Sequence, residues 1–326
     1  MQRKHHAGWC VGLGVRNPTT LAAWCLRALV LAALLLVGVP GTPARAGELA
    51  ITMDDFNLRE TTRMPAAERN QRILAALAKH RSHAALFVRA QYIESAADRE
   101  LLAAWGRAGH LIGNHTFAHR AYARQTFEEA SQDILRAHDV LSGVPGFAKL
   151  FRFPFLGEGD TVEKRDRMRR WLAEQGYRVG SVTIDASDWY YDQRLRERLA
   201  REPGFDPARY REPYLEHMWE RTGYYDGLAR RVLGRELKHT LLVHFNLVNA
   251  LFLDDLLAMY ERRGWTIIDA AKAFEDPVFA RLPDSMPSGQ SIVWGLAKES
   301  GKFERELRYP GEDGPAEKAK LDALGL

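Results

Sequence analysis

Cysteine is almost absent from this 326-residue chain, and both copies, Cys10 and Cys25, lie within its first 46 residues. Residues 47–326 therefore offer no disulfide and no thiolate, so a metal site there has to be built from histidine and carboxylate side chains. The chain also lacks internal repeats and low-complexity tracts. Its apolar and charged fractions, 46% and 27%, are ordinary for a globular protein, which excludes the disordered and fibrous classes.

The longest apolar run, residues 28–39, lies near the start of the chain. Residues 1–46 carry basic side chains and no acidic one, and the apolar run is followed by Ala44-Arg45-Ala46. This layout predicts a secretory signal peptide over residues 1–46, cleaved after Ala46. The run is too short to span a bilayer comfortably. We therefore expect an exported protein, periplasmic or secreted, without stable membrane insertion; an uncleaved anchor is the alternative.

The excess of positive charge belongs to the same segment. The chain has 46 Lys and Arg against 42 Asp and Glu, and five of the basic residues lie in residues 1–46. This leaves 41 basic and 42 acidic residues, a formal charge of −1, for residues 47–326. Bulk charge thus gives no reason to expect a nucleic-acid partner. The sequence leaves the oligomeric state open.

From residue 49 onward, strand-like and helix-like segments alternate. Ser95 with Asp98, and Thr126 with Glu129, are capping-box signatures that open two of the helices. This alternation is typical of a parallel sheet covered by helices, most economically a barrel. The expected strands are 49–53, 84–88, 110–116, 150–153, 177–184, 240–245 and 265–268, and the expected helices are 65–80, 95–109, 126–143, 162–175 and 252–263.

Side chains capable of chemistry gather in five short segments, each expected at the carboxyl end of a strand, where such barrels place their active sites. They supply two adjacent carboxylates, two histidines four residues apart, an arginine, a further carboxylate beside an aromatic, and a late histidine. Such a set can hold a divalent metal and hydrolyse a bond by acid–base chemistry. The segments are Thr52-Met53-Asp54-Asp55, His115-Thr116-Phe117-Ala118-His119, Arg152-Phe153-Pro154, Asp185-Ala186-Ser187-Asp188-Trp189 and Leu241-Leu242-Val243-His244.

Taken in order, these segments resemble the five motifs of the polysaccharide deacetylase family, which shares the NodB-homology domain and is similar to carbohydrate esterase family 4. The resemblance covers about residues 49 to 270 and implies a distorted (β/α) barrel. It suggests a catalytic domain over residues 47–275, with an aromatic-rich helical insertion at about 190–238 and a C-terminal extension over 276–326. The insertion could be a lid over the site, or helices that pack their aromatic side chains into the body.

The resemblance also implies a metal site and a base. Asp55, His115 and His119 would hold a divalent ion, zinc being the first choice and cobalt or nickel fitting the same ligands. Asp54 would be the catalytic base. Since neighbouring side chains alternate along a strand, we expect Asp54 and Asp55 to point opposite ways. A guanidinium from Arg152 beside Asp54 would lower the pKa of that carboxyl and keep it ionised.

The remaining roles concern the acid and the substrate. By resemblance, His244 would be the general acid that protonates the leaving amine, and Asp188 would hold its imidazole. Asp185 would only support Asp188. The backbone N–H of Phe155 would form part of the oxyanion hole, and Trp189 a wall of the acyl pocket.

Two departures from the family pattern concern the substrate. Phe56 follows the aspartate pair where glycine is usual, and Leu156 is inserted before Gly157. We therefore expect a bulkier entrance beside the base and a reshaped loop. The expected function is an exported, metal-dependent N-deacetylase that hydrolyses the acetamido group of an N-acetylated glycan. The alternatives are the same hydrolysis on a non-carbohydrate amide and a catalytically silent glycan-binding protein.

Overall fold

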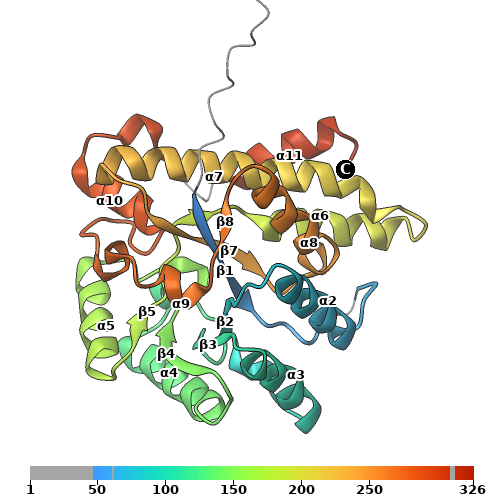
Figure 1. The fold of residues 1–326 in the computed structure, drawn as a ribbon. Helices are drawn as coiled ribbons and strands as arrows, with labels where there is room; N and C mark the ends of the chain where they lie inside the picture. Colours follow the sequence, from blue (N-terminus) through green and yellow to red (C-terminus); the bar gives the residue numbers. More distant parts are fainter. Residues whose placement is uncertain (1–46, 61, 309–312) are drawn as a thin grey trace, which may run out of the picture. The chain divides into compact units, whose positions relative to one another are not determined.

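A computed structural model of the chain describes residues 47–60, 62–308 and 313–326. The expected signal peptide, residues 1–46, lies outside the described residues. The centre of the fold is a sheet of eight strands with the order β5-β4-β3-β2-β1-β7-β6, in which β8 also pairs with the start of β1 (Figure 1). Every strand pair is parallel, which confirms the expected α/β class. The strands are β1 Glu48–Asp55, β2 Ala85–Val88, β3 Leu111–Asn114, β4 Phe147–Phe151, β5 Arg178–Val179, β6 Ile184–Asp185, β7 Lys238–His244 and β8 Thr266–Ile267.

Helices surround this sheet (Figure 1). In the described part of the chain, none of them is both long and apolar enough to cross a membrane. The α-helices are α2 Ala66–Lys79, α3 Ala96–Arg107, α4 Phe127–Leu141, α5 Val162–Glu174, α6 Asp188–Arg201, α7 Arg211–Leu233, α8 Leu247–Arg262, α9 Ala270–Ala273, α10 Ile292–Ser300 and α11 Asp313–Ala323.

The connection between β5 and β6 forces the sheet to curl. These two strands lie at opposite ends of a seven-strand path, which in a flat sheet would separate them by about 29 Å. The chain from Val179 to Ile184 can span at most about 18 Å. The sheet therefore bends round on itself, as expected for a distorted barrel. Ile292 and Ser291 of the C-terminal extension bond this connection, donating to the carbonyls of Val182 and Thr183 at 2.8 and 2.7 Å.

The expected strand 177–184 is wrong, because its residues pair with two different strands. Gly180 still donates to the Phe151 carbonyl of β4 at 2.7 Å, whereas Thr183 already bonds Thr240 of β7. The chain thus crosses from one edge of the sheet to the other within three residues. Both expected capping boxes are confirmed. The helix expected at 252–263 begins earlier, at Leu247, because Asn246 caps it.

The expected insertion consists mainly of α6 and α7. Four of its tyrosines are wholly buried, so its aromatic side chains belong to the core of the protein, as in the second of the two expected arrangements. They are Tyr191, Tyr210, Tyr214 and Tyr225. Helix α11 is joined to α7 by a buried carboxylate, because Glu317 forms ion pairs with His217 and Arg221.

The cap of α4 offers a test of the fold. Thr126 accepts the Glu129 backbone N–H, and Thr126→Ala removes this acceptor. We expect the free energy of unfolding to fall by about 1 kcal/mol, because an N–H of the first turn loses its partner. Thr126→Ser keeps the hydroxyl and should unfold like the parent. Urea titrations followed by circular dichroism measure both, and equal midpoints for the alanine variant and the parent would contradict the assignment.

Candidate metal and catalytic site

A cavity of about 790 Å³ opens at the carboxyl ends of the strands. It collects side chains from all five sequence motifs or from residues directly beside them. Of the residues to which the resemblance gives a role, Arg152 and Asp188 lie behind the cavity wall and are buried. The others line the cavity: Asp54, Asp55, His115, His119, Phe155, Asp185, Trp189 and His244.

Asp55, His115 and His119 form a group that fits a metal ion. The Nε2 atoms of the two histidines are 3.1 Å apart, and they lie 3.7 and 3.3 Å from Oδ1 of Asp55. Atoms bound to one ion at about 2.1 Å in tetrahedral or octahedral geometry are separated by about 3.0–3.4 Å. In the described part of the chain, the buried Oδ1 of Asp55 has no hydrogen-bond donor. A divalent cation would satisfy this orphaned oxygen and both imidazoles.

The surroundings of the two histidines keep them neutral and oriented. His115 follows β3 directly, and its Nδ1–H donates to the Arg152 carbonyl at 2.8 Å, which leaves the Nε2 lone pair facing the cavity. Burial lowers the pKa of His115 to about 4. Burial, together with the neighbouring His115, also lowers the pKa of His119 to about 4. At neutral pH both rings therefore offer the unprotonated nitrogen that a metal requires.

A tight turn at the end of β1 corrects the expectation that Asp54 and Asp55 point opposite ways. Asp55 has φ 79°, and the Phe56 N–H donates to the Asp54 carbonyl at 3.1 Å, which closes a three-residue turn. Strand alternation ends at this turn. Both carboxylates consequently reach the same atom, Nε2 of His115, each at 3.7 Å.

Arg152 holds the carboxylate of Asp54 from behind. Its Nη1 donates to Asp54 Oδ1 at 2.6 Å and to the Thr52 hydroxyl at 3.0 Å, and its Nε donates to the Gly180 carbonyl at 2.8 Å. The guanidinium also lies over the Phe87 ring, 3.9 Å from its centroid. The expected pairing of Arg152 with Asp54 is thus present.

The net pKa of Asp54 differs from the expectation. Burial raises the pKa of this carboxyl, and the opposing effect of Arg152 only partly offsets it, so the pKa lies above its ordinary value. Sequence reasoning counted the arginine but not the burial. The pKa of Asp55 shifts downward: burial raises it, but His244 and the two nearer histidines outweigh that effect. The two adjacent carboxylates are thus electrostatically distinct.

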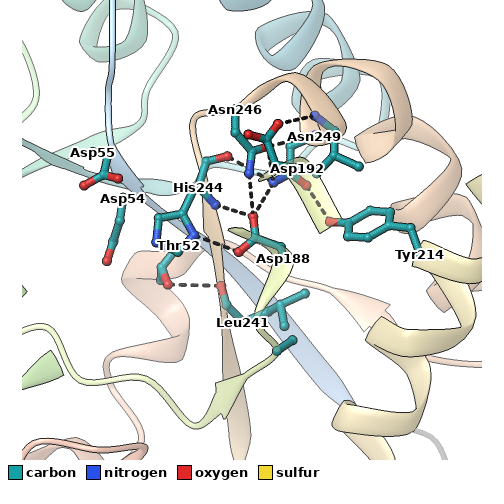
Figure 2. Close-up of polar contacts among 12 residues, drawn as sticks. Thr52, Asp54, Asp55, Asp188, Asp192, Tyr214, Leu241, His244, Asn246 and Asn249 are labelled. Atoms are coloured by element: carbon teal, nitrogen blue, oxygen red, sulfur yellow. Dashed lines mark hydrogen bonds and ion pairs between the residues drawn. The ribbon is translucent and has the colours of Figure 1, made fainter. Parts of the chain in front are cut away.

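His244 ends β7 and is the register partner of Asp54 on the neighbouring strand. Its Nδ1 lies 2.7 Å from Oδ1 of Asp188, the first residue of α6, which leaves Nε2 for the cavity (Figure 2). Burial lowers the pKa of His244, but the Asp188 carboxylate overrides it and raises the pKa to about 10. His244 is therefore a protonated imidazolium at neutral pH. Asp185 also lines the cavity, and its carboxylate favours the charged form of Arg152.

The rim of the cavity is aromatic. Phe155 is 67% exposed and Trp189 is 43% exposed. Phe155 and Leu156 both adopt left-handed backbone conformations, with φ 57° and 55°, so the loop has an unusual course at the inserted residue. The expectation for Phe56 is wrong: its ring is wholly buried and packs on Phe245, with centroids 4.7 Å apart, instead of narrowing the entrance.

Sequence reasoning missed the contribution of the C-terminal extension. Pro287 and Gln290 line the cavity from the side of Leu156. Gly289 between them packs so closely that an added Cβ would lie 1.9 Å from the Leu156 carbonyl oxygen, and its φ of 80° also suits glycine. The sequence marks this stretch only as rich in proline, which gives no sign that it forms a wall against a loop so distant along the chain.

Part of the chain matches a known protein family. Residues 42–185 match the family described as polysaccharide deacetylase. The matched region belongs to the polysaccharide deacetylase family. It includes four of the five sequence motifs in whole or in part, and it ends before His244.

Similar proteins carry deacetylase names. The chain is 26% identical over 147 residues to a peptidoglycan-N-acetylglucosamine deacetylase of Bacillus cereus, covering 45% of this chain and 48% of that protein. It is 29% identical over 145 residues to the peptidoglycan-N-acetylmuramic acid deacetylase PdaC of Bacillus subtilis. This match covers 43% of this chain and 26% of that protein. The match thus spans half or less of these relatives. The structure of the chitin deacetylase from Colletotrichum lindemuthianum matches this chain with a TM-score of 0.49 at 16% sequence identity. The match covers 70% of this chain and 88% of that one.

Metal binding by the polysaccharide deacetylase region can be tested directly. We expect the metal-free protein to bind one Zn²⁺ ion, and His119→Ala to weaken binding about 100-fold or more by removing one of three donors. The matched control is His83→Ala, which removes an exposed histidine paired with Asp269. Isothermal titration calorimetry measures all three proteins. Equal affinity of His119→Ala and the parent would rule out this site.

Proposed function

We propose that this chain is an exported, metal-dependent N-deacetylase that hydrolyses the acetamido group of an N-acetylated glycan. The observation that carries the proposal is the position of Asp54. This one carboxylate bonds Arg152 at 2.6 Å, lies 3.7 Å from the metal-donor His115, and is the register partner of His244. A base, a metal site and an acid therefore face one cavity.

The base side of the reaction rests on Asp54. A divalent ion held by Asp55, His115 and His119, with zinc as the first choice, would supply Lewis acidity that polarises the acetyl carbonyl and acidifies water. Asp54 takes the proton of the attacking water, and its raised pKa makes it a stronger base than an ordinary aspartate. Arg152 keeps the carboxylate aimed at the cavity.

The acid side rests on His244. Attack of water on the carbonyl carbon gives a tetrahedral oxyanion, to which the backbone N–H of Phe155 donates. His244 Nε2 then passes its proton to the sugar nitrogen as the C–N bond breaks, releasing acetate and a free amine. Asp188 holds the ring through Nδ1 and stabilises the imidazolium until that transfer.

The substrate class follows from the cavity and the relatives. The exposed Phe155 and Trp189 at the rim offer flat apolar faces on which sugar rings can stack. Both curated relatives are named for deacetylation of peptidoglycan sugars. Export by the expected signal peptide would bring the enzyme outside the cytoplasm, where such glycans lie.

Acetate release from a panel of N-acetylated oligosaccharides tests the proposal. The protein of residues 47–326 should release acetate with zinc or cobalt, lose activity on chelation, and recover it when metal is restored. His115→Ala should abolish release, and Asp54→Asn should abolish it while metal still binds. If no sugar reacts although metal binds, small arylamides become the substrates to assay. Unchanged glycan affinity in Asp54→Asn, with no turnover by the parent, would indicate a binding protein.

The pH dependence of kcat provides a separate test of the acid. Since the Asp188 carboxylate raises the pKa of His244 to about 10 against the effect of burial, the acid keeps its proton through neutral pH. We expect kcat to fall only as the pH approaches that value. Asp188→Asn removes the main cause of the raised pKa, so the fall of kcat at alkaline pH should begin at a lower pH in this variant. If kcat of this variant falls at the same pH as kcat of the parent, His244 is not the acid.

A further inference from the structure

Asp188 accepts four hydrogen bonds, although only one of them comes from the His244 ring. Its Oδ1 faces Nδ1 of His244 at 2.7 Å. Its Oδ2 accepts from the His244 backbone N–H at 2.8 Å, from Nδ2 of Asn246 at 3.1 Å and from Nδ2 of Asn249 at 2.7 Å (Figure 2). The carboxylate is 1% exposed, so these donors replace its water.

The two asparagine amides can serve as donors only in one orientation each. Asn246 is fixed as the N-cap of α8, because its Oδ1 accepts the Asn249 backbone N–H at 3.0 Å and its Nδ2 must then face Asp188. Asn249 lies inside the helix and needs another partner for its oxygen. If its amide were reversed, Oδ1 would face the Asp188 carboxylate and repel it.

Nδ2 of Asn249 also donates to the His244 carbonyl and to Asn246 Oδ1, each at 3.0 Å, and Tyr214 supplies the donor for the oxygen of this amide. Its hydroxyl donates to Asn249 Oδ1 at 2.6 Å, which turns Nδ2 of that amide toward Asp188 (Figure 2). Tyr214 is wholly buried, and burial raises the pKa of its hydroxyl well above the ordinary value, so the group remains a donor. Tyr214 belongs to α7, in the insertion, and it lies outside the cavity lining.

A second carboxylate one turn further along α6 keeps the two helices in place. Asp192 Oδ1 accepts the backbone N–H groups of Leu247 and Val248 at 2.9 and 3.1 Å, in the first turn of α8. This satisfies two N–H groups that a helix start leaves unpaired, and it puts a negative charge at the positive end of α8. Helix α6 is therefore anchored to α8 beside Asp188.

We propose that Tyr214 and Asn249 are positioning residues for the general acid, acting through Asp188 to hold the His244 ring at the angle required for proton transfer. The inference rests on the proposed function. It also explains what the insertion contributes to the site, because α7 carries the hydroxyl that orients the Asn249 amide. Neither residue lines the cavity.

Tyr214→Phe is the decisive variant, because it removes one oxygen and leaves the ring in place. We expect kcat for an N-acetylated oligosaccharide to fall about 10-fold with KM changed less than about 2-fold, and Asn249→Ala to lower kcat about 100-fold, since general acids contribute about 10²–10⁴. The matched control is Tyr260→Phe, which changes a wholly buried tyrosine of α8 whose hydroxyl bonds Thr222 of α7 instead. It should keep the parent kcat.

A substrate whose leaving group needs no proton distinguishes a misplaced general acid from a general loss of activity. 4-Nitrophenyl acetate releases a phenolate that leaves without a proton, so Tyr214→Phe should hydrolyse it at the parent rate. Equal losses on the ester and the acetamide, or no loss on either, would overturn the proposal.

The geometry can also be measured without turnover. In ¹⁵N-histidine-labelled protein, the His244 Nδ1 proton should give a downfield resonance in the parent and in Tyr260→Phe, and a broadened one in Tyr214→Phe. An identical resonance in all three would contradict the proposed positioning. If the parent releases no acetate from any sugar, the proposed function fails, while this resonance still decides whether Tyr214 orients the pair.

Discussion

One buried guanidinium joins most of the elements on which the site depends. Arg152 at the end of β4 bonds Asp54 and Thr52 of β1 and the Gly180 carbonyl, and it lies over the Phe87 ring of β2. Its own carbonyl accepts from the His115 ring. Removing one partner of such a buried pair typically costs about 3–5 kcal/mol, because a charge is left uncompensated. The position of the proposed base, Asp54, and the tautomer of a proposed metal donor, His115, are thus set by one residue.

The half of the site around the proposed acid, His244, is held by different means. Its carboxylate is on the first turn of α6, and the donors around it come from the start of α8 and from α7. Strand pairing then joins the halves, because Asp54 and His244 occupy opposite register positions on β1 and β7. Adjacent parallel strands lie about 4.8 Å apart. The proposed base and the proposed acid are therefore brought together by backbone hydrogen bonds, and each is oriented by its own side-chain partners.

How much the sequence could predict depended on the range of the interaction. The capping boxes at Ser95 and Thr126 were predictable because both partners lie within one turn. The motif residues were found by their resemblance to a known family, and parallel strands bring these strand-end residues to one edge of the sheet. Phe56 was misplaced because its direction depends on a turn with positive φ, which no propensity reveals. The roles of Tyr214 and Gln290 had no local signal, since each acts on a partner that is distant in the sequence.

Burial alone does not decide the charge of a histidine in this cavity. Burial lowers the pKa of His115, His119 and His244 alike, yet the first two have pKa values of about 4 and the third of about 10. The difference between His115 and His244 lies in the second ring nitrogen. That of His115 donates to a neutral carbonyl, whereas that of His244 faces the ionised Asp188. Residues of one type can therefore offer lone pairs to a cation and a proton to a leaving amine in the same cavity at the same pH. The charge of His115 and of His244 is therefore determined by the group that the second ring nitrogen faces, on the side of the ring away from the cavity.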